Sequence, residues 1–96
     1  MIDSIIGTLE DTAAWRRQKA SGYDDVRNIQ AAEDLEAFCA ELRQGNPDLN
    51  EEISEAYEAN PERFWEVVHE EVKSVGFSSC VASGESLLRS VLRRLV

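Results

Sequence analysis

Apolar residues recur with a helical period along most of the chain. Between residues 26 and 44, side chains that fall about 100° apart form one continuous stripe. This stripe consists of Asn28, Ala31, Ala32, Leu35, Phe38, Cys39 and Leu42. No segment shows the period-two alternation of β-branched residues that a half-buried strand needs. The pattern therefore predicts an all-α protein, a small bundle of four to five helices, with 26–44 as the spine of its core.

Two Asn-Pro dipeptides divide the middle of the chain. Asn46-Pro47 and Asn60-Pro61 each resemble a helix N-cap followed by proline at the first helical position. They predict a short helix between them and a further helix from Pro61 to Val75. The short helix is expected to lie on the outside of the bundle because its apolar face is small. That face consists of Leu49, Ile53, Ala56 and Tyr57.

Serine and glycine mark the expected ends of the other helices. The first helix is predicted from Asp3 to Ala20, with Ser21 and Gly22 ending it. Gly45 is expected to stop the 26–44 helix through a left-handed C-terminal position, and Gly76 is expected to stop the helix that begins at Pro61. A final amphipathic helix is predicted to begin at Ser78 or Ser83, and its apolar stripe consists of Leu88, Val91, Leu92 and Leu95.

Length and composition indicate one helical domain over residues 1–96. Apolar residues at 43% and charged residues at 30% are typical of a soluble globular protein. No run approaches the roughly 20 apolar residues that cross a bilayer, and residues 1–12 do not resemble a signal peptide. Two cysteines, Cys39 and Cys80, are fewer than a small secreted domain usually carries, and a disulfide between them is disfavoured. We therefore expect a cytoplasmic protein.

The negative charge is concentrated in one stretch. The chain has a formal net charge of −9, and residues 48–71 alone carry −8, with Arg63 as their single base. Residues 1–47 carry −4 and residues 72–96 carry +3. A field this uneven repels nucleic acid and anionic membranes and attracts basic surfaces, so we expect no direct nucleic-acid or membrane partner.

Within that stretch, glutamates form two rows at helical spacing. One row is Glu51, Glu55 and Glu58, and the other is Glu62, Glu66 and Glu70. Almost no lysine or arginine is interleaved, so each row has a cost in repulsion. Two interpretations remain open: a solvated face that maintains solubility, or a docking surface for a basic protein, which electrostatic complementarity would attract.

Trp15 lies opposite the apolar stripe of the first helix. Tryptophan on a polar face is characteristic of binding hot spots. The competing interpretation is that the first helix is packed between two neighbours, or begins later in the chain, so that Trp15 lies under the C-terminal helix. The small basic cluster beside Trp15 is insufficient for nucleic-acid binding by so acidic a chain.

The supply of catalytic and metal-binding groups is small. His69 is the only histidine, and its position favours a surface or boundary location. Cys39 lies in an apolar stripe, whereas Cys80 precedes or opens a helix, which can lower a thiol pKa. No zinc, calcium or phosphate-loop motif is present. We expect neither an enzyme nor a bound metal or cofactor.

These observations favour an acidic protein-binding module that acts by occupancy. Its expected contact residues are Trp15, Glu51, Glu55, Glu58, Glu62, Glu66 and Glu70. The expected partner is a basic protein, such as one that binds nucleic acid. Proteins of this size and charge include antitoxins, immunity proteins and phage-encoded inhibitors that cover a basic nucleic-acid site. The alternative is a self-associating structural bundle or a subunit of a larger assembly, including a homodimer through the C-terminal helix.

Overall fold

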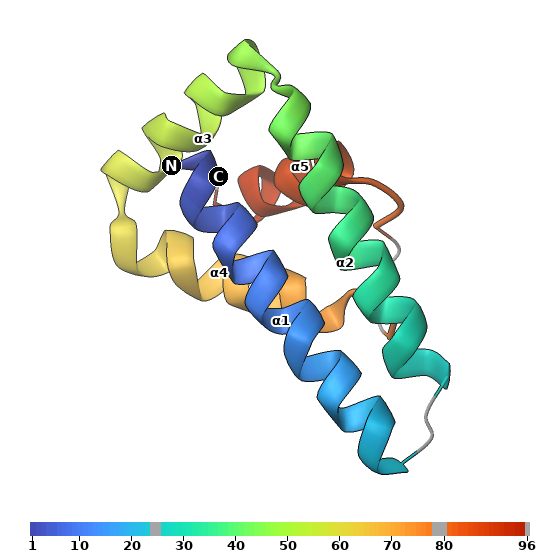
Figure 1. Cartoon of the computed structure of the whole chain (residues 1–96). Coiled ribbons are helices and arrows are strands. Elements are labelled where there is room, and N and C mark those ends of the chain that lie inside the picture. The colour runs from blue at the N-terminus through green and yellow to red at the C-terminus, as the bar shows by residue number, and fades with distance from the viewer. Residues whose placement is uncertain (24–25, 78–80, 96) are drawn as a thin grey trace.

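The computed structural model describes residues 1–23, 26–77 and 81–95, apart from the side chain of Tyr23, and these form five helices without a strand (Figure 1). The helices are α1 (Ile2–Tyr23), α2 (Val26–Gln44), α3 (Pro47–Ala59), α4 (Pro61–Ser74) and α5 (Gly84–Leu95). The predicted all-α class is confirmed, as are the bounds of the 26–44 helix.

Helices α1 and α2 form a long antiparallel hairpin (Figure 1). All seven residues of the predicted α2 stripe are buried, including the polar Asn28. The prediction that α1 ends at Ser21 and Gly22 was wrong, because the helix continues to Tyr23. Gly22 does not take the left-handed conformation that stops a helix, and a glycine inside a helix costs only about 1 kcal/mol. Helical hydrogen bonding therefore continues through both residues.

Both Asn-Pro dipeptides begin helices as predicted. The Asn46 side chain accepts a hydrogen bond from the Leu49 N–H at 3.3 Å, and the Asn60 side chain accepts one from the Arg63 N–H at 3.2 Å. The Asn60 N–H also donates to the carbonyl of Ala56 at 3.4 Å. One residue therefore closes α3 and opens α4, which fixes the turn between them.

The segment after α4 is anchored by Gly76. The helix ends at Ser74, one residue before the predicted end, and Gly76 has φ +83°. Gly45, at the end of α2, has φ +88°, so both glycines take the left-handed conformation that was predicted for Gly45. A side chain at Gly76 would lie 2.7 Å from the Ala31 Cβ, so the backbone here packs directly on α2.

Helix α5 begins at Gly84 with Ser83 before it. The Ser83 hydroxyl accepts a hydrogen bond from the Ser86 N–H at 3.1 Å, which supports the predicted start at Ser83. The alternative start at Ser78 lies outside the described residues. Leu88 and Val91 are buried as expected, and so is Leu87, which the predicted stripe omitted.

The core lies between the hairpin and the other helices. Helices α4 and α5 pack on each other, α1 contacts α4, and α2 contacts α5 (Figure 1). Helix α3 contacts α4 and α5 at one end of the molecule. It buries only Leu49 and Ile53, so most of its surface faces outward, in agreement with the predicted external position.

Candidate protein-binding surface

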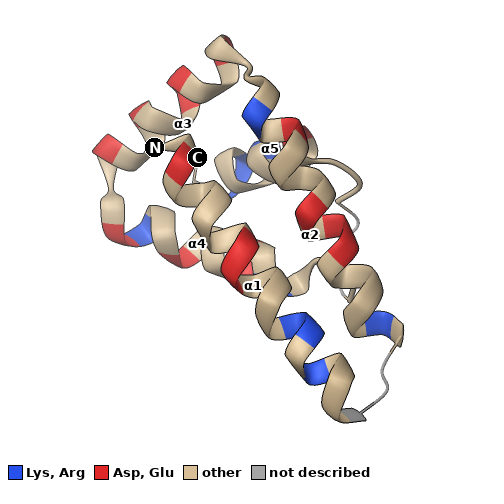
Figure 2. Ribbon diagram, viewed as in Figure 1, with Lys and Arg blue, Asp and Glu red and all other residues tan. Residues whose placement is uncertain are grey.

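The glutamates of α3 form an exposed row without ion pairs. We call Glu51, Glu55 and Glu58 the α3 ridge, and all three are exposed. Across the described ranges 1–23, 26–77 and 81–95, no ion pair involves an α3 carboxylate. Figure 2 shows the acidic positions of this helix at one end of the molecule. The α3 ridge is therefore available to a partner.

The second row, the α4 ridge, is partly neutralised. It consists of Glu62, Glu66 and Glu70, which are exposed. Arg63 pairs with Glu66 at 2.6 Å, and Arg94 pairs with Glu70. The hydrogen bond from Arg94 lowers the pKa of the Glu70 carboxyl. The two ridges, alike in sequence, therefore differ in the structure, and only the α3 ridge keeps all of its charge uncompensated by ion pairs.

Arg94 joins α5 to α4. Its guanidinium donates to Glu70 and, at 3.2 Å, to Glu71, which is only 9% exposed. Local sequence patterns do not indicate this pairing, because Arg94 lies more than twenty positions beyond both glutamates. Local spacing, which identified Arg63 as the single base of the acidic stretch, cannot detect a base supplied by another helix.

Trp15 belongs to a different surface from the glutamates. It is 44% exposed, with the Arg16 guanidinium 4.7 Å and the Lys19 ammonium 4.9 Å from its ring centre. Arg16 also lies 4.2 Å from the ring centre of Phe77, which Arg27 approaches at 5.3 Å. We call these five residues the cation–aromatic cluster. The interpretation that Trp15 packs beneath the C-terminal helix was wrong.

The cluster lies away from the α3 ridge. At a rise of about 1.5 Å per residue, Trp15 is about 20 Å along α1 from its N-terminal end. In the view of Figure 2 that N-terminal end and α3 are at the same end of the molecule, whereas most basic positions of the hairpin lie toward its opposite tip. The structure therefore does not bring Trp15 together with the glutamates, although both were expected in one contact surface.

Arg16 also connects helices of the bundle through hydrogen bonds. Its Nη1 donates to the Asn28 side chain at 3.1 Å, and its Nη2 donates to the Lys73 carbonyl at 2.6 Å. These bonds connect α1, α2 and the end of α4, and they satisfy the Asn28 side-chain oxygen, which is buried in the α2 stripe. The ring contacts of Trp15 and Phe77 with Arg16 are thus also part of the packing of the bundle.

A groove runs between α3 and α5. It consists of two adjoining hollows of about 420 and 450 Å³, which share Glu52 and Leu92. Its α3 wall is formed by Glu52, Glu55, Ala56 and Ala59, its α5 wall by Ser86, Arg89, Leu92, Arg93 and Leu95, and its end by Asn60 and Arg63. We call this the α3–α5 groove. Sequence periodicity could not reveal it, because it arises from the spacing between two helices.

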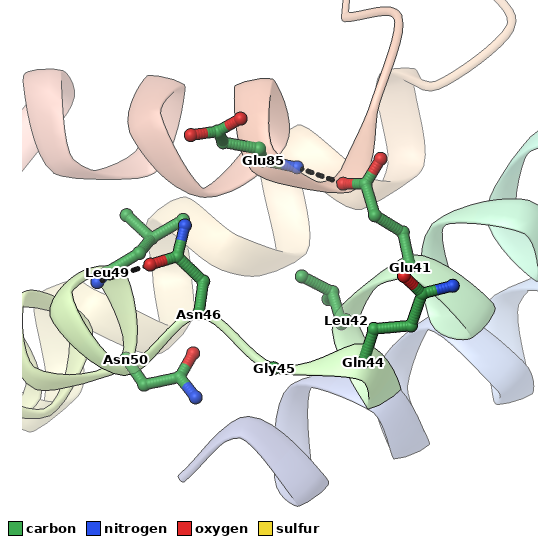
Figure 3. Close-up of a pocket in the computed structure, with 8 residues that line it drawn as sticks. All are labelled: Glu41, Leu42, Gln44, Gly45, Asn46, Leu49, Asn50 and Glu85. Atoms are coloured by element: carbon green, nitrogen blue, oxygen red, sulfur yellow. Dashed lines mark hydrogen bonds between the residues drawn. The ribbon is translucent and has the colours of Figure 1, made fainter.

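A smaller pocket lies between the end of α2 and the start of α5, and polar side chains in its lining cap the starts of helices. It has a volume of about 150 Å³. The Glu41 carboxylate accepts a hydrogen bond from the Glu85 N–H at 2.6 Å, and Asn46 caps α3 on the other side (Figure 3). A side chain at Gly84 would lie 2.7 Å from that carboxylate. Two of its polar side chains therefore hold helix starts.

Of the remaining candidate groups, His69 and Cys39 lie in different environments. His69 is exposed, with its ring centre 5.8 Å from that of Trp65. Cys39 is buried, and burial raises the pKa of its thiol, as expected for a small apolar core residue. The expectation for Cys80 lies outside the described residues. Among those that are described, no three metal-ligating side chains gather.

Over the same residues, no helix is long and apolar enough to cross a membrane. No protein-family model matches the chain, and neither a curated protein nor a solved structure is significantly similar to it.

Proposed function

We propose that this protein is an acidic protein-binding module that acts by occupying a basic protein. The observation that carries the proposal is the α3 ridge, a row of exposed carboxylates without an ion pair in the described part of the chain. Several other glutamates are paired across helices, as Glu36 is with Arg17 and Glu10 is with Arg43. The α3 ridge is a whole row whose charge is left for solvent or for a partner.

Like charges at i, i+4 spacing destabilise a helix by a few tenths of a kcal/mol per pair. A basic partner relieves this repulsion, so α3 gains stability on binding. The same field speeds the encounter with a basic surface and disfavours acidic competitors. Action by occupancy requires only that the protein cover the basic site of its partner.

The partner class that fits is a protein whose own basic site serves another acidic ligand, such as nucleic acid. A carboxylate row competes for the lysines and arginines that would contact phosphates. In this form the protein is a small inhibitor or regulator. The alternative is a self-associating bundle in which the acidity serves solubility alone.

Affinity capture from a lysate of the native host, at low and high salt, tests the proposal. The test variant carries Glu51→Gln, Glu55→Gln and Glu58→Gln. The matched control carries Asp11→Asn, Glu33→Gln and Asp34→Asn, three exposed carboxylates of α1 and α2 without ion pairs in the described residues. Both variants lose three charges, so only the location of the charge differs.

We expect a basic protein that the wild type and the control variant retain at low salt, that high salt releases, and that the α3 ridge variant does not retain. Equal capture by both variants would show that general acidity, rather than the ridge, is responsible. Capture of the protein's own copies alone would favour the self-associating bundle.

A further inference from the structure

We infer that the partner presents a basic amphipathic helix to the α3–α5 groove, with its apolar side chains in the groove and its Lys or Arg row against α3. This inference rests on the proposed function and names the chemistry of the partner segment. It also replaces Trp15 as the apolar anchor, since Trp15 lies in the cation–aromatic cluster.

Part of the groove lining offers apolar surface to an incoming helix. Leu92 and Leu95 are only partly buried, although both belong to the apolar stripe of α5, and Ala56 adds small apolar surface on the α3 wall. Small side chains on one wall leave room that an incoming Leu or Phe can fill. Amphipathic helices bind such grooves through anchors at i, i+3 or i+4, and i+7.

The charges of the groove specify the orientation of the incoming helix. Glu52 and Glu55, on the α3 wall, have no ion pair in the described ranges. Of the three arginines that line the groove, Arg89 pairs with Glu85 at 3.0 Å and Arg63 pairs with Glu66, so only Arg93 has no ion pair in the described ranges. Within these ranges, the α3 wall therefore carries two unpaired negative charges, against one unpaired positive charge on the α5 wall. A helix with Lys or Arg along one flank of its apolar stripe complements that wall.

Glu55 connects the groove to the proposed docking surface, because it lines the groove and also belongs to the α3 ridge. The ridge can attract a basic protein, while the groove supplies apolar burial at about 25 cal/mol per Å². A charged rim beside a desolvated anchor is the usual arrangement of an interface hot spot.

Fluorescence polarisation with designed peptides tests the inference on the full chain. The first probe is a basic amphipathic peptide of about five helical turns, or about 18 residues. A second has the same composition in scrambled order, and a third has Glu in place of Lys. We expect the amphipathic basic peptide to bind at least about tenfold more tightly than the scrambled one, and the acidic peptide not to bind.

Two variants locate the binding. Ala59→Gln places a longer side chain of high helix propensity in the groove, whereas Ala40→Gln makes the same change on the exposed face of α2. We expect Ala59→Gln to remove the preference for the amphipathic peptide and Ala40→Gln to preserve it, with unchanged circular dichroism in both. Combining Glu52→Gln with Glu55→Gln should weaken binding of the basic peptide severalfold.

Several outcomes would overturn the inference. Equal binding of the amphipathic and scrambled peptides would mean that charge alone acts; if α3 ridge neutralisation also removed that binding, the proposed function would survive without the groove. Failure of the basic peptide to bind would reject the groove as a binding site for a basic helix. The α3 ridge would still be tested by the affinity capture. Concentration-dependent dimers in sedimentation, lost in Ala59→Gln, would assign the groove to a second copy of this chain.

Discussion

At the scale of single residues, Gly76 combines a left-handed backbone with close packing on α2. Its φ is +83°, and an added Cβ would meet the Cβ of Ala31 at 2.7 Å and its Cα at 3.0 Å. A non-glycine residue in the left-handed region costs about 1–2 kcal/mol. Overpacking adds about 1–3 kcal/mol. Gly76→Ala should therefore lower the free energy of unfolding by more than either effect alone.

Gly45→Ala is the matched control. Gly45 has φ +88° but has open space where its Cβ would be, so this variant should lose the conformational part only. Urea unfolding of both variants measures the difference. Equal losses would mean that the contact of Gly76 with α2 contributes nothing to stability.

Arg94 is the residue whose removal should change the pH dependence of stability. Its hydrogen bond lowers the pKa of Glu70 in the folded protein. A carboxyl with a lowered folded pKa contributes stability above its unfolded pKa of about 4.3, and this is lost as pH falls through the folded value. Arg94→Ala should therefore unfold at lower urea than wild type at pH 7, and the difference should shrink below pH about 4.

Arg93→Ala is the control for that measurement, because Arg93 is exposed and has no ion pair in the described ranges. Its urea midpoint should stay close to wild type at both pH values. A gap between Arg94→Ala and wild type that is the same at pH 7 and pH 3 would exclude the carboxylate pairing as its cause.

At the scale of helices, Asn60 couples the end of α3 to the start of α4. Its side chain accepts from the Arg63 N–H while its own N–H donates to the Ala56 carbonyl. Asn60→Ala should cost about 1 kcal/mol of unfolding free energy, and Asn60→Ser, which keeps a capping oxygen, should remain within about 0.5 kcal/mol of wild type. Thermal unfolding followed by circular dichroism distinguishes the two. An alanine variant as stable as the serine variant would contradict the capping account.

The helices were predictable where the local signal was strong. Asn46-Pro47 and Asn60-Pro61 bounded α3 because capping depends on neighbours in sequence. The end of α1 was not predictable in this way, since Ser21 and Gly22 permit a stop without requiring one. The burial of Leu87 depends on how α5 lies on the bundle, which its own periodicity does not specify completely.

At the scale of the whole molecule, the chain separates two surfaces. The α3 ridge lies at one end, and the cation–aromatic cluster lies toward the opposite tip of the hairpin (Figure 2). The sequence identified the glutamates and Trp15 as separate features, but their placement depends on tertiary packing. The same holds for Arg94 and the α3–α5 groove, each of which joins segments distant in sequence.

The most direct test of the account is the dissociation constant of the captured basic partner, measured for wild type, the α3 ridge variant and the matched control between about 0.05 and 0.5 M salt. We predict that neutralising the ridge weakens binding at low salt at least about tenfold, or about 1.4 kcal/mol, and flattens the salt dependence, while the control stays close to wild type. Equal dissociation constants and equal salt slopes for the two variants would contradict the α3 ridge as the docking surface.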